Sequence, residues 1–173
     1  MINYDLKKIR AMAFDVDGVL SAALVGLLEA ASQPLRTANT KDGYAMQLAV
    51  KRGLRLAIIT GGRSEAVRRR YVGLGLQDVF MGVSVKISCF EDWMEESGLK
   101  PEEVLYMGDD IPDYEVLRRC GLPCCPADAA PEIREICTYV SPYAGGQGCV
   151  RDVIEQVLRT QNVWMTDATA FGW

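Results

Sequence analysis

Two carboxylates stand two residues apart in the stretch Phe14-Asp15-Val16-Asp17-Gly18-Val19-Leu20. They follow an apolar run, residues 9–13, that is typical of a buried strand, so both side chains are expected on the same side of the backbone. Gly18 permits a sharp turn and lets a ligand approach the backbone closely. Carboxylate oxygens beside open backbone amides can hold Mg²⁺ and a phosphoryl group. The stretch alone does not distinguish this chemistry from an acidic surface turn.

Three other polar groups stand where further elements end or begin. Thr60-Gly61 follows the apolar run 54–59, Lys86 begins a helical segment, and Asp109-Asp110 follows the run 104–107. Taken singly, they have plainer explanations: a strand-to-helix turn, a solvated helix start and a helix cap. The carboxyl ends of parallel strands meet at one edge of a sheet, so these groups are expected to converge. Their convergence favours catalysis over chance.

The convergent groups can carry out phosphoryl transfer. Asp15 is the candidate nucleophile, forming an aspartyl-phosphate. Asp17 can protonate the leaving alkoxide and later deprotonate water. Mg²⁺ is expected to take oxygens from Asp15, from the backbone carbonyl of Asp17 and from Asp109.

The remaining groups have supporting parts in this chemistry. Thr60 and the amides around Gly61 can hold phosphate oxygens, while Lys86 offsets their negative charge. Asp110 is placed to orient waters on the metal or the Lys86 ammonium. Phosphoryl transfer requires mainly positioning and charge neutralisation, and this set supplies both.

Strands and helices alternate along the chain, which predicts an α/β fold: a three-layer, Rossmann-like parallel sheet with helices on both faces. Residues 1–160 are expected to form a single domain, followed by a C-terminal tail at residues 161–173. A β-hairpin is predicted after the first strand, over about residues 21–39. The other predicted strands are residues 54–59, 78–81, 104–107, 122–125 and 138–140.

Composition excludes several classes of protein. The chain has 173 residues, 49% of them apolar, and a net charge of −4, which disfavours nucleic acid as a partner. It has no apolar run long enough for a membrane span and no signal-peptide pattern at its start, so a cytoplasmic location is expected. The absence of histidine leaves carboxylates, lysine, hydroxyls and metal for catalysis. The six cysteines form no C-x-x-C pair and are interpreted as reduced thiols rather than a zinc site.

In order, Asp15-Val16-Asp17-Gly18-Val19, Thr60-Gly61, Lys86 and Gly108-Asp109-Asp110 resemble the four motifs of haloacid dehalogenase superfamily phosphatases. No large cap insertion interrupts them. The chain is similar in size and order to the capless members that hydrolyse 3-deoxy-D-manno-octulosonate 8-phosphate, a sugar acid phosphate, in lipopolysaccharide precursor synthesis. The resemblance implies a Mg²⁺ cofactor. It also implies a homotetramer in which a neighbour's hairpin and tail help to close the active site.

The resemblance extends to candidate substrate residues: Asn39, Asp42, Arg63 and Arg70. Two features depart from the family pattern. Gly62 stands where Arg or Lys is usual, and the hairpin lacks the usual Asp-Gly and Gly-Glu pairs. The nine-carbon substrate 2-keto-3-deoxynononate 9-phosphate is therefore an alternative. A non-catalytic interaction module of the same fold and a phosphorylated receiver-type domain are the alternatives from other classes.

Overall fold

Six parallel strands form the centre of the protein, in the order β3-β2-β1-β4-β5-β6. The structure, a computed structural model of the chain, describes residues 1–29 and 33–172. The order reverses direction at β1, whose neighbours β2 and β4 lead to opposite edges of the sheet. The strands are β1 (Ala11–Phe14), β2 (Arg55–Thr60), β3 (Asp78–Met81), β4 (Val104–Met107), β5 (Leu122–Cys125) and β6 (Tyr139–Val140).

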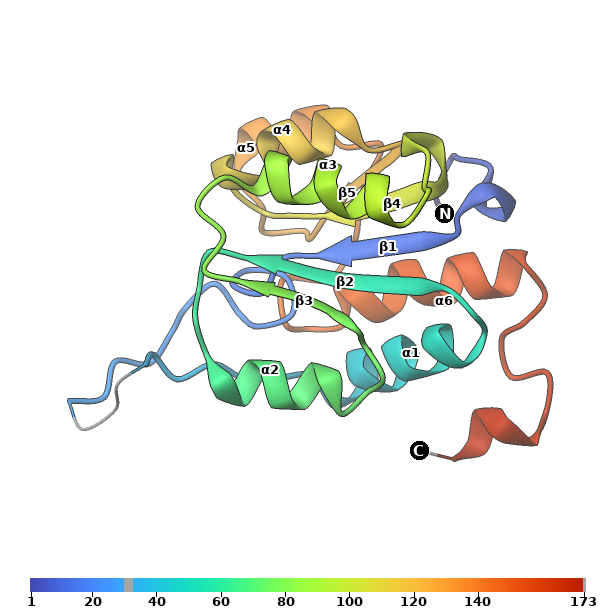
Figure 1. Cartoon of the computed structure of the whole chain (residues 1–173), viewed down its shortest axis with the longest axis horizontal. Helices are drawn as coiled ribbons and strands as arrows, with labels where there is room; N and C mark the ends of the chain where they lie inside the picture. The colour runs from blue at the N-terminus through green and yellow to red at the C-terminus, as the bar shows by residue number, and fades with distance from the viewer. Residues whose placement is uncertain (30–32, 173) are drawn as a thin grey trace.

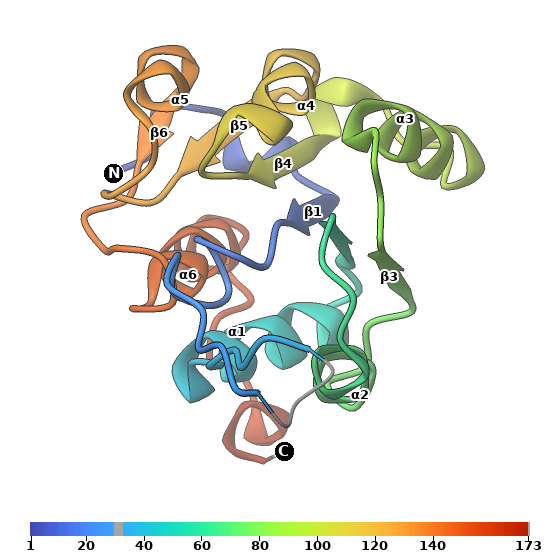
Figure 2. The same ribbon diagram turned by 90° about the vertical axis from the view of Figure 1, so that its left-hand side faces the viewer.

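Helices cover both faces of the sheet, giving three layers (Figures 1 and 2). On one face lie α3 (Lys86–Glu96), α4 (Tyr114–Arg119) and α5 (Pro131–Ile136). On the other lie α1 (Thr40–Lys51), α2 (Glu65–Val72) and α6 (Cys149–Thr160). Four one-turn 3₁₀ helices complete the described elements: η1 (Leu6–Lys8), η2 (Pro101–Glu103), η3 (Ile111–Asp113) and η4 (Ala168–Phe171). The predicted three-layer parallel α/β architecture is confirmed.

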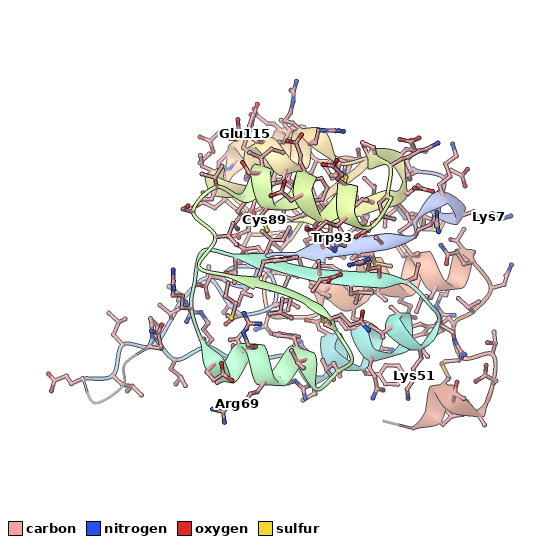
Figure 3. The ribbon with its side chains drawn as sticks, in the orientation of Figure 1. Lys7, Lys51, Arg69, Cys89, Trp93 and Glu115 are labelled. Atoms are coloured by element: carbon pink, nitrogen blue, oxygen red, sulfur yellow. The ribbon has the colours of Figure 1, made fainter. Side chains whose placement is uncertain are left out.

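The alternation of side chains along β1 sorts the core into two parts. Met12 and Phe14 belong to the cluster under α1 and α6, while Ala11 and Ala13 belong to the cluster under α3. Successive residues of a strand point to opposite faces, which explains the division. The small alanines leave room for large rings from the α3 side, including Trp93, which lies between that helix and the sheet (Figure 3).

Helix α6 shows how the second layer is attached. Val150, Val153, Ile154, Val157 and Leu158 recur at helical spacing and are fully buried against the sheet and α1. Burying each such side chain contributes about 1.5–3 kcal/mol of transfer free energy. These contacts hold α1, and the loop that precedes α6, rigidly beside the end of β1.

The predicted β-hairpin at residues 21–39 is wrong for the part of it that the structure describes. Residues 21–29 and 33–39 contain no strand, and one isolated antiparallel bridge pairs Gly26 with Leu35. The predicted turn at residues 30–32 lies outside the described residues. We call the described residues 21–29 and 33–39 the arm; they project beyond the carboxyl ends of the strands (Figure 1). Two short extended pieces without a third strand or a covering helix lack the packing that a stable hairpin requires.

The described part of the tail packs against α1 of its own chain. Trp164 meets the ring of Tyr44 edge-on at 6.0 Å, and the Tyr44 hydroxyl donates to the carbonyl of Ala170 at 2.6 Å. Arg52 donates to the carbonyl of Val163 at 2.9 Å. Among the described residues, no helix has the length and apolar character needed to span a membrane.

Candidate active site

A hollow of about 440 Å³ opens at the carboxyl ends of the strands, beside β1 and β4 where the strand order reverses. Ligands of open parallel sheets bind at this position. Seven of the residues singled out from the sequence line this strand-end hollow: Asp15, Asp17, Thr60, Gly61, Lys86, Asp109 and Asp110. The structure therefore brings the predicted catalytic, metal-binding and phosphate-binding residues together.

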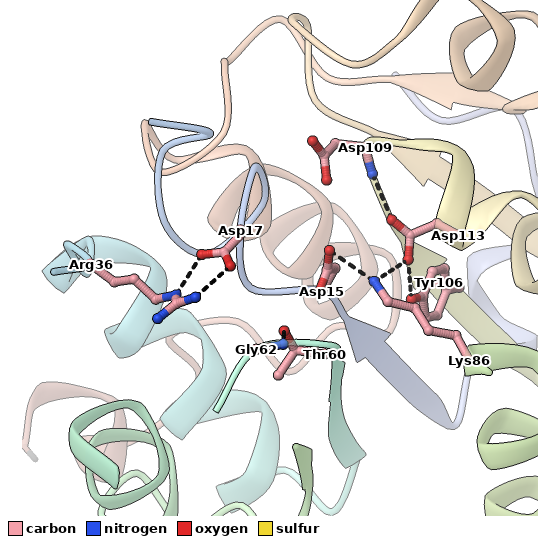
Figure 4. Close-up of polar contacts among 9 residues, drawn as sticks. All are labelled: Asp15, Asp17, Arg36, Thr60, Gly62, Lys86, Tyr106, Asp109 and Asp113. Atoms are coloured by element: carbon pink, nitrogen blue, oxygen red, sulfur yellow. Dashed lines mark hydrogen bonds and ion pairs between the residues drawn. The ribbon is translucent and has the colours of Figure 1, made fainter. Parts of the chain in front are cut away.

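Lys86 is a buried cation held between two carboxylates (Figure 4). Its Nζ lies 2.9 Å from Asp15 Oδ2 and 2.7 Å from Asp113 Oδ1. The Tyr106 hydroxyl donates to the same Asp113 oxygen at 2.6 Å, and the amide of Asp109 donates to Asp113 Oδ2 at 3.2 Å. This network fixes the ammonium beside Asp15 and ties Asp109 to the first turn after β4.

Burial and the crowding of carboxylates raise the pKa values of Asp15 and Asp109. The pKa of Asp15 rises to about 6, chiefly through burial and then through repulsion by Asp113, with Lys86 opposing both. The pKa of Asp109 rises to about 7 through burial and then repulsion by Asp15 and Asp113. Burial lowers the pKa of Lys86, but attraction to Asp15 and Asp113 outweighs it and the pKa is raised overall. The site thus carries negative charge that a cation would stabilise.

The residues present fit a divalent metal. Carboxylate oxygens of Asp15, Asp109 and Asp113 lie within 4.8 Å of one another. Asp113 already accepts three hydrogen bonds, so Asp15 and Asp109 have the oxygens left to offer. Asp15 Oδ1 is buried and has no partner among the described residues. Two or more hard oxygen donors of this kind suit Mg²⁺.

Gly18 is needed for this arrangement. Its φ of +86° lies in the left-handed region that favours glycine, and a Cβ at this position would overlap the carboxylate of Asp109. Any side chain here would therefore displace one of the two candidate metal ligands.

Asp17 is held by an arginine from the arm. Arg36 Nε lies 2.6 Å from Asp17 Oδ1, and its Nη2 lies 2.8 Å from Oδ2 (Figure 4). Gly62 adjoins this pair, because a Cβ there would come within 2.9 Å of Arg36 Nη2. The expected role of the Asp17 carbonyl as a metal ligand stays a prediction.

Thr60 and Asp110 differ in their surroundings. The Thr60 side chain is buried, and its hydroxyl accepts from the amide of Gly62 at 3.2 Å, which fixes the start of the loop after β2. Asp110 is exposed on the rim of the strand-end hollow. The carboxylates that contact Lys86 are those of Asp15 and Asp113, so the proposed part of Asp110 in orienting Lys86 stays a prediction.

Asn39 and Asp42 lie outside the strand-end hollow, at the start of α1. Asn39 caps that helix, accepting from the amide of Lys41 at 2.9 Å, and donates to the carbonyl of Gly146 at 3.1 Å. Asp42 is buried and accepts from the amide of Arg151 at 2.7 Å. In the structure, both residues join α1 to α6 and to the loop before it.

Arg63 and Arg70 point to different places. The Arg63 guanidinium lies over Gly82, where a Cβ would come within 2.8 Å of its Cζ. Arg70 lines a second hollow of about 530 Å³ between the arm and α2, which we call the arm hollow. A contact of either residue with substrate remains a prediction.

Three residues of the site were not singled out from the sequence: Arg36, Tyr106 and Asp113. Asp113 had a recognisable signal, since it lies four residues after Asp109 at the end of a one-turn helix and can return to the same side. Tyr106 lies within the apolar run that predicts β4, so the sequence indicates only a core residue there. Arg36 lies in the irregular arm, where no periodicity indicates the direction of a side chain.

Comparison with known proteins places this site in a family. A model described as haloacid dehalogenase-like hydrolase matches residues 39–121. The 3-deoxy-D-manno-octulosonate 8-phosphate phosphatase KdsC of Escherichia coli K12 is 37% identical over 155 residues, which are 90% of this chain and 82% of the relative. The crystal structure of the Yersinia pestis phosphatase of that name has a TM-score of 0.88 at 32% identity, covering 91% of this chain and 85% of that one.

A third relative was solved with ligands. The 3-deoxy-D-manno-octulosonate 8-phosphate phosphatase of Moraxella catarrhalis, in complex with magnesium ion, phosphate ion and KDO, has a TM-score of 0.90 at 29% identity. The match covers 96% of this chain and 95% of that one. The likeness extends through the whole sheet and both helical layers. The chain therefore belongs to the haloacid dehalogenase-like hydrolases and, within them, to the KdsC family.

Proposed function

We propose that the chain is a Mg²⁺-dependent phosphatase that hydrolyses 3-deoxy-D-manno-octulosonate 8-phosphate to the free sugar acid and phosphate, in lipopolysaccharide precursor synthesis. One observation carries the proposal: Asp15, with a free buried oxygen, stands between Lys86 and the neighbouring carboxylate of Asp109 in an open hollow. The choice of substrate is supported by the chain's membership of the KdsC family, whose named activity is on this sugar acid phosphate.

In the proposed reaction, a carboxylate oxygen of Asp15 attacks phosphorus while the bond from phosphorus to the sugar oxygen breaks. Lys86, fixed 2.9 Å from Asp15 Oδ2, offsets the negative charge of the phosphoryl oxygens. Thr60 and the loop amides after it hold those oxygens in place. When bound, Mg²⁺ supplies charge neutralisation between the phosphate and the carboxylates of Asp15 and Asp109.

Asp17 moves the protons. In its protonated form it gives a proton to the departing sugar oxygen, and as a carboxylate it accepts one from the water that hydrolyses the aspartyl-phosphate. That water's oxygen attacks phosphorus, the bond to Asp15 breaks, and phosphate leaves. Asp15 is thereby restored for the next turnover.

Phosphate release from 3-deoxy-D-manno-octulosonate 8-phosphate tests the proposal. We expect steady turnover with millimolar Mg²⁺ and a loss of at least ~10²-fold in EDTA, because the phosphoryl charge is then unscreened. The measurement is phosphate release across a panel of sugar phosphates, with Mg²⁺ added back after EDTA as the control. An enzyme inactive on every sugar acid phosphate in the panel would overturn the proposal.

The same panel separates the alternatives. A higher kcat/KM on 2-keto-3-deoxynononate 9-phosphate would assign the nine-carbon substrate instead. A chain that binds a sugar acid phosphate without hydrolysing it would be the non-catalytic module. A phospho-aspartate that persists for minutes would be the mark of a receiver-type domain. The buried Asp15–Lys86 pair favours the enzyme, because a binding module requires no nucleophile.

We also propose that the protein assembles as a homotetramer, with the arm and the tail of one copy helping to close a neighbour's site. Leu24, Leu27 and Leu35 of the arm are 91%, 81% and 58% exposed, which is unusual for leucine in a monomer. A second copy of the same chain is the economical cover for such a surface.

Static light scattering at micromolar concentration tests the assembly. We expect the mass of a tetramer for the unaltered chain and a smaller species for a variant carrying Leu24→Asp and Leu27→Asp, because charge on a buried apolar contact is strongly unfavourable. Val72→Asp, at an exposed apolar residue of α2, is the control and should leave the mass unchanged. A monomeric mass for the unaltered protein would contradict the proposal.

For the organisation of the chain, we propose a single catalytic domain at residues 1–160 with residues 161–173 as its tail. A cytoplasmic location is proposed as well. It is supported by the six cysteines, all of which are free in the structure.

A further inference from the structure

Arg36 lies between the two hollows of the catalytic edge. Its guanidinium makes a two-pronged contact with Asp17, which lines the strand-end hollow, and its side chain is only 9% exposed. The same residue lines the arm hollow, beside Arg70 of α2. Gly62 leaves the space that the guanidinium occupies. One side chain, carried by the arm, therefore separates the reacting end of the site from the adjoining cavity.

The observed pair leaves neither carboxylate oxygen of Asp17 free to contact a substrate. Both oxygens accept from the Arg36 guanidinium, at 2.6 and 2.8 Å. Proton transfer to the leaving group requires one of those oxygens within hydrogen-bond reach of the sugar oxygen. The Arg36–Asp17 pair must therefore open before Asp17 can act on the substrate.

An anion bound in the arm hollow would compete with Asp17 for the Arg36 guanidinium. That hollow of about 530 Å³ is lined by two arginines, Arg36 and Arg70. The one acidic residue among its lining groups, Glu65, is paired with Arg69 at 3.2 Å. A carboxylate that binds in the arm hollow would be attracted by the two arginines. It could accept the hydrogen bonds that Arg36 donates to Asp17 in the structure.

We propose that Arg36 determines substrate specificity. It restrains Asp17 until an anionic group of the substrate binds in the arm hollow and pairs with the Arg36 guanidinium in place of Asp17. The inference rests on the proposed function and concerns the regulation of that same site. A phosphate ester with a second anionic group releases Asp17 as it binds. An ester without one leaves Asp17 paired and is turned over slowly.

The test compares two substrates in the complete, Mg²⁺-loaded enzyme: 3-deoxy-D-manno-octulosonate 8-phosphate, which carries a carboxylate, and glucose 6-phosphate, which does not. Both release a sugar alkoxide that requires a proton. In Arg36→Ala, kcat/KM for the sugar acid phosphate should fall by about 10- to 100-fold, mainly through KM, since a charge-assisted contact to substrate is lost. The kcat for glucose 6-phosphate should rise, because Asp17 is no longer restrained. Arg36→Lys should restore part of the discrimination between the two.

Other outcomes would overturn the inference. An equal fall on both substrates would make Arg36 a residue that merely positions Asp17, and no change on either would remove it from the mechanism. Arg36→Gln provides a second variant should the alanine variant fold poorly. Arg119→Ala, an exposed arginine of α4, is the matched control. An unaltered enzyme active on glucose 6-phosphate but on no sugar acid phosphate would overturn the proposed function first, and this inference with it.

Discussion

Replacing Asp15 with asparagine is expected to lower kcat by about 10⁵-fold or more, since removal of a nucleophile leaves only binding and electrostatic stabilisation. The amide keeps the shape of the carboxylate and can still accept from Lys86, which lies 2.9 Å from Oδ2 in the native enzyme. It cannot form an aspartyl-phosphate. Steady-state phosphate release, followed by acid quench and mass spectrometry of the peptide containing Asp15, measures both consequences.

The fold should tolerate this substitution. Burial raises the pKa of Asp15 from 3.8 to about 6, so the ionised side chain is less favourable in the folded protein than in the unfolded chain. The contribution of Asp15 to the free energy of unfolding therefore falls as the pH rises from about 4 to about 6. Asparagine does not titrate and removes this pH dependence. We expect the urea midpoint of the variant at pH 7, measured without Mg²⁺, to be equal or higher.

Asp5→Asn is the matched control for the Asp15 experiment. Asp5 is exposed beside η1, 3.8 Å from Lys8, and its substitution should leave kcat and the urea midpoint unchanged. If Asp15→Asn retained a tenth of the native kcat, or if a phosphoryl group were found on a different residue, Asp15 would not be the nucleophile. A variant that unfolded would instead show that the carboxylate is needed for stability.

The strands of the sheet were predictable because each is specified by a short run of neighbouring residues. The strands predicted at residues 78–81, 104–107 and 122–125 are β3, β4 and β5 with the same limits, since short apolar runs bounded by Gly, Pro and acidic residues specify both an element and its ends. Parallel strands then place Asp15, Thr60 and Asp109 at one edge without further information. The convergence of the catalytic groups therefore follows from chain order alone.

The missed parts of the site depend on contacts between distant segments. Lys86 and Asp113 are 27 residues apart, and their pairing follows from the packing of α3 against the segment after β4. Arg36 reaches Asp17 from an arm whose conformation no repeating pattern specifies. The hairpin prediction failed for a related reason: apolar alternation indicates strands only where a sheet exists to pair with them.

Asp113→Ala should both destabilise the protein and weaken catalysis. Removing this carboxylate takes from the buried Lys86 ammonium one of its two anionic partners and leaves the Tyr106 hydroxyl without an acceptor. Breaking a buried ion pair from one side costs about 3–5 kcal/mol of unfolding free energy. Loss of the hydrogen bond to the Asp109 amide should weaken Mg²⁺ binding by about 10- to 100-fold, as for other residues that orient a metal ligand.

An opposing effect has to be weighed. Asp113 also repels Asp15 and Asp109, so its removal relieves some of the strain on both. Burial is the larger cause of their raised pKa values, however, and it remains after the substitution. Lys86 Nζ lies 2.7 Å from the Asp113 oxygen that would be removed. The cost of leaving this buried ammonium with one anionic partner should outweigh the relief of repulsion. Urea unfolding and a titration of activity against Mg²⁺ measure the two effects separately.

Two companion variants separate contributions of the bonds to Asp113, and a third serves as the control. Asp113→Asn keeps an acceptor for Lys86 and Tyr106 but turns an amide donor toward the Asp109 amide, so about 1–3 kcal/mol should be lost. Tyr106→Phe removes one donor alone and should cost about 1 kcal/mol with little change in Mg²⁺ affinity. Glu115→Gln, exposed two residues further on, is the control. If Asp113→Ala bound Mg²⁺ as tightly as the unaltered enzyme, the network around Lys86 would serve stability only, and Asp109 would be held in place by the backbone after β4.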